Sequence, residues 1–266
     1  MNSDLKIFCV TDKPIPLLEK TNLVMAGVGT NEFSKNYIKS SDGNNIFHKE
    51  KYYSELTFHY WYWKNLLAEE VSEWVGFCQK RRFWIKHDSK NKLINLKNID
   101  EHILKNPCND WANYNSIICE STNVSGAKKI KLIKRGWRNI IRDPNILFNK
   151  KKETIKVHFD LHHGFGNLDK AIQVMDLKDR NDFKNWVNNN CYYNPHIMFI
   201  AKKDIINNWF QDLFNWLKEC EVIFGFKNLH GYDTGRLYAY LAERYLSFWF
   251  RKYTKFKEHP WTFVDQ

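Results

Sequence analysis

The sequence has few of the residues that mark fibrous, low-complexity or disulfide-rich proteins: 11 Gly, 6 Pro and 6 Cys among 266 residues. So little glycine and proline excludes a collagen-like or low-complexity chain. The cysteines are scattered and form no CxxC pair, so we expect reduced thiols rather than a disulfide scaffold or a thiolate zinc site. This usage is typical of a protein of the reducing cytoplasm.

Long hydrophobic runs are also absent. The longest ones, such as residues 197–201, fall far short of the roughly 20 residues that a transmembrane helix needs. The opening six residues lack the apolar segment of a signal peptide. We therefore expect a cytoplasmic protein without a membrane-spanning helix.

Negative charge is in the minority, since 41 Lys and Arg stand against 30 Asp and Glu, a net charge of +11. This balance excludes an acidic disordered tail and suits three partners: nucleic acid, an anionic membrane surface or small phosphorylated substrates. A low-GC genome would also enrich Lys and Asn, so part of the charge can be coding bias. Hydrophobic residues are 43% and aromatic residues 16%, enough to bury a large core.

Several motifs of well-known enzyme classes are missing. The sequence has no glycine-rich phosphate loop, GxSxG elbow or HExxH helix, which counts against P-loop hydrolases, serine hydrolases and zincins. The basic run from Lys128 to Arg142 contains Trp137 but no known nucleic-acid-binding motif. We therefore expect no nucleic-acid partner, and the alternative for this run is an exposed helix or loop face.

The apolar pattern predicts an α/β fold. Short apolar runs predict buried strands at residues 5–10, 23–27, 74–78, 116–119 and 154–161. Apolar residues three or four apart predict helices at residues 52–70, about 168–176, 205–217 and 237–248. Residues 30–49 are polar and predict an exposed loop. Strands early and helices late, with no repeat or evident linker, predict one domain in which C-terminal helices close a central mixed sheet.

The most metal-like feature is the trio His158, Asp160 and His162. On the predicted strand these side chains share a face, where two imidazoles and a carboxylate can hold a divalent metal with open positions. The alternative is a polar strand edge beside a Gly164-Phe-Gly166 turn, or a single substrate contact. A metal-dependent hydrolase built on this trio therefore stays open.

A cationic triplet, Lys80-Arg81-Arg82, follows the predicted strand 74–78. Guanidinium groups at the carboxyl end of a strand suit the binding of phosphate, although a solvated charge run is the alternative. The loop from Asp42 to Asn45 offers amide and backbone donors, and by itself it is a good turn.

Several strings resemble a bacterial family of glycosyltransferase-like proteins from capsular-polysaccharide and lipopolysaccharide gene clusters. The family shows GxNI, ELTxxYWxWKN and GxxHYRRxF in this order, and this chain has Asp42-Gly-Asn-Asn-Ile46, Ser54-Glu-Leu-Thr57 with Tyr60-Trp-Tyr-Trp-Lys-Asn65, and Gly76-Phe-Cys-Gln-Lys-Arg-Arg-Phe83. Farther on, Ile197-Met-Phe-Ile200 with Lys202-Lys203, and Arg236 with Leu241-Ala-Glu-Arg244, are similar to its NMFIxKK and RxxGxxxERL segments. The resemblance covers nearly the whole chain.

The chain also departs from that pattern. Gln79-Lys80 replaces the His-Tyr before the paired arginines, Ile197 replaces the Asn of NMFI, and the glycine of the last segment has no counterpart. His163 matches the family's histidine after the mid-chain strand. The chain thus resembles a divergent member with a different donor or acceptor sugar.

The resemblance implies transfer of a sugar from a nucleotide-sugar donor, the co-substrate, to a growing capsular or lipopolysaccharide glycan. It implies a GT-A-like fold, with the donor-binding part at about 1–120 and the acceptor side and closing helices at about 150–255. The acceptor would be a glycan or a lipid-linked oligosaccharide at the inner membrane face, where a basic protein makes peripheral contact with anionic lipid. Whether the reaction uses a divalent metal, Mn or Mg, stays open.

The implied chemistry selects candidate residues. The departing diphosphate needs cations and the acceptor hydroxyl needs a base. The expected donor-binding residues are Thr11, Asp12, Asp42, Asn44, Asn45, Arg81 and Arg82. The candidate bases are, in order, Asp160, His163 and Glu243, and further candidates are Glu55, Arg236 and Arg244.

Each of these has a structural alternative. Glu55 can stabilise a helix N-terminus or pair with an arginine, and Glu243 with Arg244 can form an ordinary salt bridge. Tyr60-Trp-Tyr-Trp63 can stack on sugar rings, but helical spacing sends at most one or two of these side chains into a site. A non-catalytic glycan- or nucleic-acid-binding protein is the remaining alternative function.

Overall fold

The computed structural model describes residues 4–127 and 129–265. It divides into two compact units. Unit 1 comprises Met1–Glu120, His196–Asp212 and Trp249–Gln266, and unit 2 comprises Ser121–Pro195 and Leu213–Phe248.

Unit 1 is built on a mixed sheet with the strand order β10-β6-β9-β4-β1-β2-β3. The strands are β1 (Leu5–Thr11), β2 (Val24–Gly27), β3 (Ile38–Lys39), β4 (Trp74–Gln79), β6 (Ser116–Cys119), β9 (Phe199–Ala201) and β10 (Phe256–His259). β1 is parallel to β2 and β4, whereas β9 is antiparallel to β4 and β6. β5 (Arg82–Trp84) turns back from β4 and pairs with β11 (Trp261–Phe263). The predicted α/β class with a central mixed sheet is confirmed.

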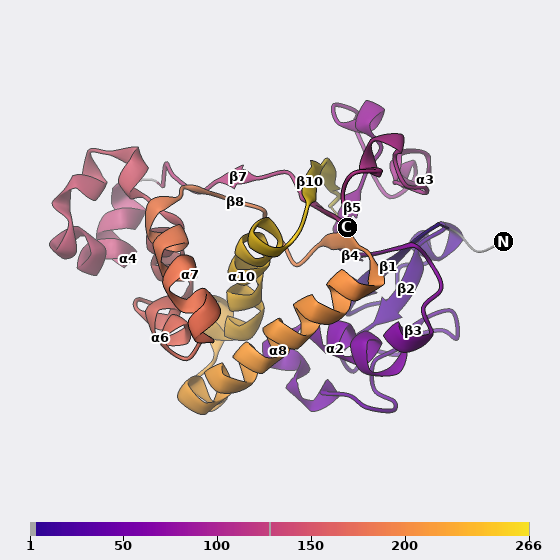
Figure 1. The fold of residues 1–266 in the computed structure, drawn as a ribbon, viewed down its shortest axis with the longest axis horizontal. Coiled ribbons are helices and arrows are strands. Elements are labelled where there is room, and N and C mark those ends of the chain that lie inside the picture. The colour runs from indigo at the N-terminus through magenta and orange to yellow at the C-terminus, as the bar shows by residue number, and fades with distance from the viewer. Residues whose placement is uncertain (1–3, 128, 266) are drawn as a thin grey trace. The chain divides into compact units, whose positions relative to one another are not determined.

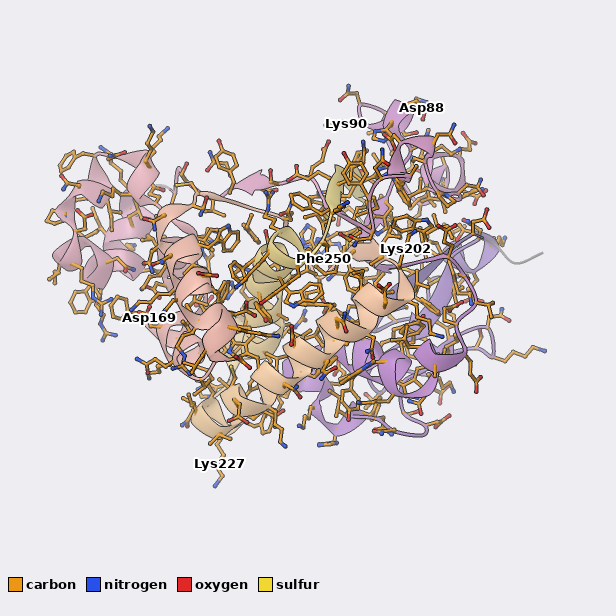
Figure 2. All side chains as sticks on the ribbon, in the orientation of Figure 1. Asp88, Lys90, Asp169, Lys202, Lys227 and Phe250 are labelled. Carbon is orange, nitrogen blue, oxygen red and sulfur yellow. The ribbon has the colours of Figure 1, made fainter. Side chains whose placement is uncertain are left out.

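The central strands are apolar on both faces because both faces are covered. On one face Phe77 of β4 packs at 5.7 Å from Phe8 and 5.8 Å from Phe210 of helix α8 (Lys203–Phe224). Phe250 of α10 (Leu237–Tyr253) joins this aromatic cluster through Phe199 and is labelled in Figure 2. The opposite face is covered by the segment that carries α3 (Ile99–His102).

The helix predicted at residues 52–70 is interrupted. The structure has α1 (Glu50–Tyr53) and α2 (Leu56–Asn65), separated by Ser54, whose φ of 51° lies in the left-handed region. A single helix cannot continue through such a residue. The aromatic stripe therefore belongs mainly to α2, where Phe58 and Tyr62 pack on Phe8.

Unit 2 is mainly helical. It contains α4 (Lys129–Arg142), α5 (Ile155–His163), α6 (Asn167–Gln173), α7 (Leu177–Asn189), α9 (Gly231–Thr234), parts of α8 and α10, and the short strands β7 (Thr122–Asn123) and β8 (Tyr192–Tyr193) (Figure 1). Phe183 of α7 packs edge-on against Trp216 and Tyr245, and the Tyr245 hydroxyl donates to Asp179 at 2.7 Å. These contacts form the aromatic core of the unit.

The strand predicted at residues 154–161 is wrong, because this segment is helix α5. Thr154 caps its N-terminus by accepting from the backbone N–H of Val157 at 3.5 Å, and Gly164, with φ of 93°, follows its last turn. Most α5 side chains are buried, so the apolar run reflects a buried helix. Periodicity alone does not separate a short buried helix from a buried strand.

The remaining predicted elements at 5–10, 23–27, 74–78, 116–119, 168–176, 205–217 and 237–248 are confirmed, although α8 and α10 extend seven and five residues beyond the predicted ends. The order of strands early and helices late is wrong, since β9, β10 and β11 follow residue 198. All six cysteines are free thiols. In the described part of the chain, no helix combines the length and the apolar character that crossing a bilayer requires.

Candidate functional site

The carboxyl ends of β3, β2, β1 and β4 meet at one edge of the sheet, because each of these strands is parallel to its neighbour. In open α/β sheets this edge is where ligands bind. Thr11 is the last residue of β1, and Asp12 follows it. The loop at 42–45 comes soon after β3, and Lys80 and Arg81 follow β4. The predicted donor-binding residues thus lie at or near this edge: Thr11 ends β1, Arg82 begins β5, and the others lie in the loops.

Asp12 and Lys80 form an ion pair that joins the segments after β1 and β4. The backbone carbonyl of Asp12 also accepts from Asn31 Nδ2 at 2.6 Å. Thr11 is buried, and its hydroxyl donates to the carbonyl of Lys13 at 2.6 Å and accepts from the N–H of Lys13 at 3.1 Å. Thr11 therefore shapes the turn, and Asp12 and Lys80 supply the charges.

A second network connects Glu55, Gln79 and Arg82. The side-chain amide of Gln79 donates to the Glu55 carboxylate, and its Oε1 accepts from Arg82 Nη1 at 3.0 Å. Gln79 thus orients a carboxylate at the start of α2 and a guanidinium of β5 at the same time. Gln79 suits this place because an amide both donates and accepts.

Arg81 lies beside the C-terminal segment. Its Nη2 pairs with Asp265, whose side chain is 83% exposed, and its guanidinium lies 4.5 Å from the centre of the Phe263 ring. The guanidinium of Arg82 lies 5.7 Å from the same ring. Among the described residues, the Nε–H of either arginine finds no acceptor. Each guanidinium group therefore has a buried N–H donor that no described residue satisfies.

The loop at residues 42–45 is held against α2 by Asn65. Asn65 Oδ1 accepts from the N–H of Asn44 at 3.0 Å, and its Nδ2 donates to the carbonyl of Asn44 at 2.8 Å. Trp61 Nε1 donates to the carbonyl of Asp42 at 2.6 Å. The side chains of Asp42 and Asn44 stay exposed, whereas Asn45 is partly buried and bonds back into the loop.

The candidate bases belong to unit 2. Asp160 is buried and ion-pairs with Lys156 at 2.8 Å, and its other oxygen accepts from the N–H of Gly166 at 3.0 Å. His163 stacks on Tyr240 at 3.7 Å, and its Nδ1 lies 3.2 Å from the carbonyl of Asp233.

The other polar candidates of unit 2 lie on or beside α10. Glu243 pairs with Arg244, which is buried between the rings of Tyr193 and Phe159. Arg236 is exposed just before the helix. A buried guanidinium next to a carboxylate and two aromatic faces is firmly oriented.

The predicted metal geometry of His158, Asp160 and His162 is wrong. On a helix His158 and His162 are one turn apart, and their rings lie 4.3 Å from each other, with His162 Nδ1 at 2.8 Å from the carbonyl of His158. Asp160 instead bonds to Lys156 and Gly166. The three side chains therefore do not share a face, and this overturns the basis of the metal-dependent hydrolase.

The sequence analysis missed the roles of Gln79, Asn31 and Asn65, and it singled out Lys80 as part of the cationic triplet without its partner Asp12. Gln79 stands out only as a departure from the family pattern. The pairing of Gln79 with Glu55 and of Lys80 with Asp12 depends on strand order. Asn65 is the last residue of the ELTxxYWxWKN string, and its place in this family motif could have indicated a role. Asn31 lies in a polar loop and gives no signal of its own.

A separate cavity of about 640 Å³ lies at the opposite, amino edge of the sheet. Its lining includes Trp63, Glu73 and Lys202, the last labelled in Figure 2. Lys202 pairs with Glu73 at 3.3 Å, and Trp63 Nε1 donates to Asn207 at 2.9 Å. Since Glu73 precedes β4 and Lys202 follows the antiparallel β9, this cavity is distinct from the loops at the carboxyl edge.

The fold of this chain and its family are both found among known proteins. The solved apo structure of WbbM, a bifunctional glycosyltransferase, is similar to this chain with a TM-score of 0.70 and 20% sequence identity. The match covers 100% of this chain and 46% of that one, and it supports a GT-A-like fold. No curated protein matches the sequence. The family described as a domain of unknown function, DUF4422, matches residues 6–255, and the chain therefore belongs to the DUF4422 family.

Proposed function

We propose that this protein is a glycosyltransferase that moves a sugar from a nucleotide-sugar donor to a glycan of a capsule or lipopolysaccharide. The observation that carries the proposal is the ion pair of Asp12 with Lys80 beyond the carboxyl ends of β1 and β4, with Arg82 two residues farther along the chain, in a fold shared with a glycosyltransferase. In this proposal the donor-binding part is about residues 1–120, and the acceptor side with its closing helices is about residues 150–255.

In this proposal cations of the chain stabilise the leaving nucleoside diphosphate. From the last residue of β4 to the first residue of β5 the chain reads Gln79-Lys80-Arg81-Arg82 and contains no carboxylate. The nearby carboxylates of Asp12 and Glu55 already bind Lys80 and Gln79. This donor set suits an anionic ligand better than Mn or Mg, which prefer several free carboxylate oxygens. Lys80, Arg81 and Arg82 would bind the diphosphate, and the exposed pair with Asp265 would open to release Arg81.

Among the candidate bases we propose His163. With Nδ1–H donating to the carbonyl of Asp233, Nε2 carries the lone pair that takes the proton of the acceptor hydroxyl. Stacking on Tyr240 fixes the ring plane. A cation binds each of the other candidates, Lys156 at Asp160 and Arg244 at Glu243, whereas His163 contacts a neutral carbonyl and a neutral ring.

The acceptor of the proposed reaction is a glycan or a lipid-linked oligosaccharide, which would bring the protein to the cytoplasmic face of a membrane. Helix α4 supports such a contact. Four of its large apolar side chains are exposed: Ile130 at 68%, Ile133 at 56%, Trp137 at 50% and Ile141 at 71%. Spacings of three, four and four place them on one helix face.

The flanks of that face are basic. The exposed basic side chains of α4 are Lys129, Lys134, Arg135, Arg138 and Arg142, and the helix contains no Asp or Glu. The opposite side of α4 packs on α5 through Leu132, and a Cβ at Gly136 would lie 2.7 Å from Leu161. An apolar face with cationic flanks is the pattern of a helix that lies in the interface of an anionic membrane.

The function is tested by incubating the protein with each common UDP-, GDP- and CDP-sugar and measuring release of the nucleoside diphosphate, with and without a lipopolysaccharide or capsule acceptor. We expect release with one nucleotide class, accelerated by acceptor. Binding of a glycan without any release would support a non-catalytic glycan-binding protein, and inactivity with all donors would contradict the proposal.

A further inference from the structure

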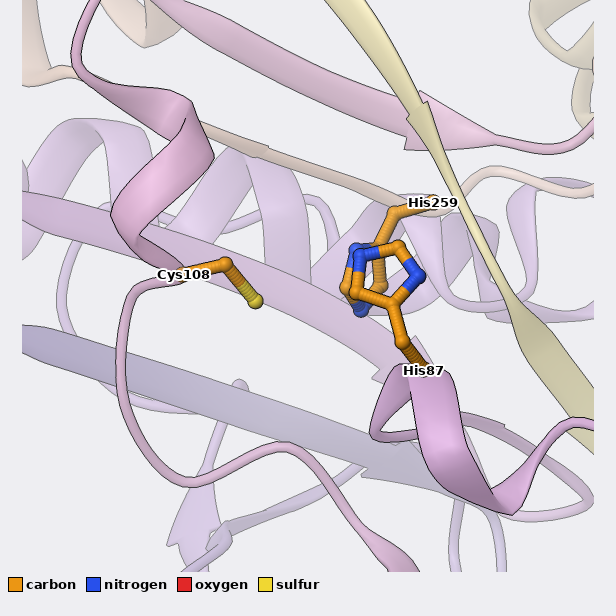
Figure 3. Close-up of side chains that lie close together, drawn as sticks. All are labelled: His87, Cys108 and His259. Atoms are coloured by element: carbon orange, nitrogen blue, oxygen red, sulfur yellow. The ribbon is translucent and has the colours of Figure 1, made fainter.

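Two imidazoles and a thiol lie together in unit 1, where three distant segments meet (Figure 3). His87 begins a short helical turn after β5, Cys108 precedes another turn at 109–111, and His259 is the last residue of β10. One ligand atom from each residue lies within 4.8 Å of the other two. Nothing in the proposed glycosyl transfer uses these three side chains.

His259 is oriented as a metal-binding histidine is. The residue is fully buried, and its Nε2 lies 2.9 Å from the carbonyl of Ile85, so Nε2–H donates there and Nδ1 carries the lone pair. Within the described residues Nδ1 has no hydrogen-bond partner. A histidine that donates one ring nitrogen to a carbonyl and offers the other to a metal is the usual arrangement in metal sites.

The two other side chains complete a metal-binding set. His87 meets the His259 ring edge-on at 4.6 Å, and the Cys108 side chain points toward the two rings in Figure 3. Asp110 lies next to them, with Oδ2 4.0 Å from His87 Nε2 and 2.9 Å from Lys257 Nζ. The charges of Asp110 and Lys257 cancel, so this ion pair adds no net charge beside the three side chains.

We propose that His87, Cys108 and His259 bind one zinc ion, with the fourth position taken by water or by Asp110. Imidazole nitrogen and thiolate sulfur are the ligands that tetrahedral Zn²⁺ prefers, at about 2.0 and 2.3 Å from the metal. Ligand atoms of such a site lie roughly 3 to 4 Å apart, so a small closing movement is enough. Binding of the metal would release the proton of the Cys108 thiol.

The site would have a structural role. It would tie the segments at residues 87 and 108 to the end of β10, and the covering segment between them contains little regular structure besides α3. Among the described residues, the buried Nδ1 of His259 finds no partner to replace the water that it loses on folding, and this loss is unfavourable. Zinc would satisfy this atom.

The test uses the whole protein, purified without a histidine tag and dialysed against metal-free buffer. We expect about one zinc per chain by elemental analysis after addition and removal of excess zinc. Replacement by cobalt should give the intense near-ultraviolet band of a thiolate bound to cobalt. Cys108→Ser and His87→Gln should each lower zinc content at least tenfold, and Cys108→Ser should remove that band.

Matched controls are Cys191→Ser and His48→Gln, which change a partly buried cysteine of unit 2 and an exposed histidine of unit 1. Both should retain zinc and the cobalt band. The variants at 87 and 108 replace accessible side chains, and circular dichroism verifies their folding. Zinc content far below one per chain in the folded wild type, or zinc content unchanged in Cys108→Ser and His87→Gln, would overturn the proposal. Donor turnover is measured separately, so failure of one proposal leaves the other intact.

Discussion

Arg82 Nη1 donates a hydrogen bond to Gln79 Oε1 at 3.0 Å, across the turn that joins β4 to β5. The amide nitrogen of the same Gln79 donates to Glu55. The guanidinium is therefore held by a neutral amide and keeps its full charge for a ligand. This relationship sets Arg82 apart from Arg81, which is paired directly with a carboxylate.

Arg82→Ala should lower kcat/KM for the donor by about 100-fold or more, because the leaving diphosphate loses an oriented cation. Arg81→Ala should have the same direction. Lys227→Ala, which removes an exposed charge in unit 2, is the control and should leave donor turnover unchanged. Initial rates over a range of donor concentrations measure the effect. Equal kcat/KM in Arg82→Ala and wild type would remove Arg82 from the proposed site.

Asn65→Ala should raise the donor KM by roughly tenfold, since it removes the side chain that holds Asn44 and loosens the loop at 42–45. The kcat should change much less, because the loop binds rather than reacts. Asn188→Ala is the matched control, as Asn188 bonds only within α7. An unchanged KM in a folded Asn65→Ala protein would contradict a role of this loop in donor binding.

His163→Ala should lower kcat by about 100-fold or more if its imidazole is the general base. His230→Ala changes an exposed histidine of the same unit and should keep wild-type turnover. Rates at saturating donor and acceptor make the comparison, with the melting temperature measured for each variant. Full kcat in His163→Ala would return the role of base to Asp160 or Glu243.

The double change Trp137→Ser and Ile141→Ser should weaken binding to vesicles that contain anionic lipid by roughly 100-fold, because two exposed apolar side chains of α4 are lost. Val222→Ser removes another exposed apolar side chain, on α8, and serves as the control. Co-sedimentation with neutral and anionic vesicles measures the effect. Binding that is the same for both variants, or absent in wild type, would exclude α4 as a membrane contact.

His59 should make folding stability depend on acid. Burial lowers the pKa of His59 to about 3, below the value of about 6.5 in an unfolded chain. Between these values only the unfolded state takes up the proton, so stability falls as pH drops below 6.5, by roughly 1 kcal/mol per pH unit.

His59→Phe should therefore flatten the dependence, because Phe fits among Phe77, Phe199 and Phe210 and does not titrate. Urea unfolding at pH 7.5 and pH 5 measures the difference between variant and wild type. Parallel losses of stability in the two proteins would show that other groups cause the acid sensitivity.

Much of the fold follows from local pattern. Buried parallel strands such as β1 and β4 are uninterrupted apolar runs, and the long helices α8 and α10 carry clear stripes, so both kinds of element are predictable. Strands β9, β10 and β11 are three or four residues long and are defined by partners far along the chain. No local pattern carries that information.

The candidate site, like the fold, could be predicted from the sequence only in part. Arg82 and the loop at 42–45 are visible in the sequence because strand ends and turn residues mark them. The error at residues 154–161 arose because a nine-residue buried helix has no polar face to reveal its period. The proximity of His87, Cys108 and His259 depends on the pairing of β5 with β11 and of β6 with β10, so spacing could not indicate it.

The central claim is that a nucleotide sugar binds at the carboxyl edge through Arg82. The most direct test is the melting temperature of wild type and Arg82→Ala with UDP, GDP, CDP and their common sugars, with and without manganese. We predict that one nucleotide class raises the melting temperature of wild type, without manganese, and has little effect on Arg82→Ala. No shift with any nucleotide in folded wild type, or equal shifts in the two proteins, would contradict the account.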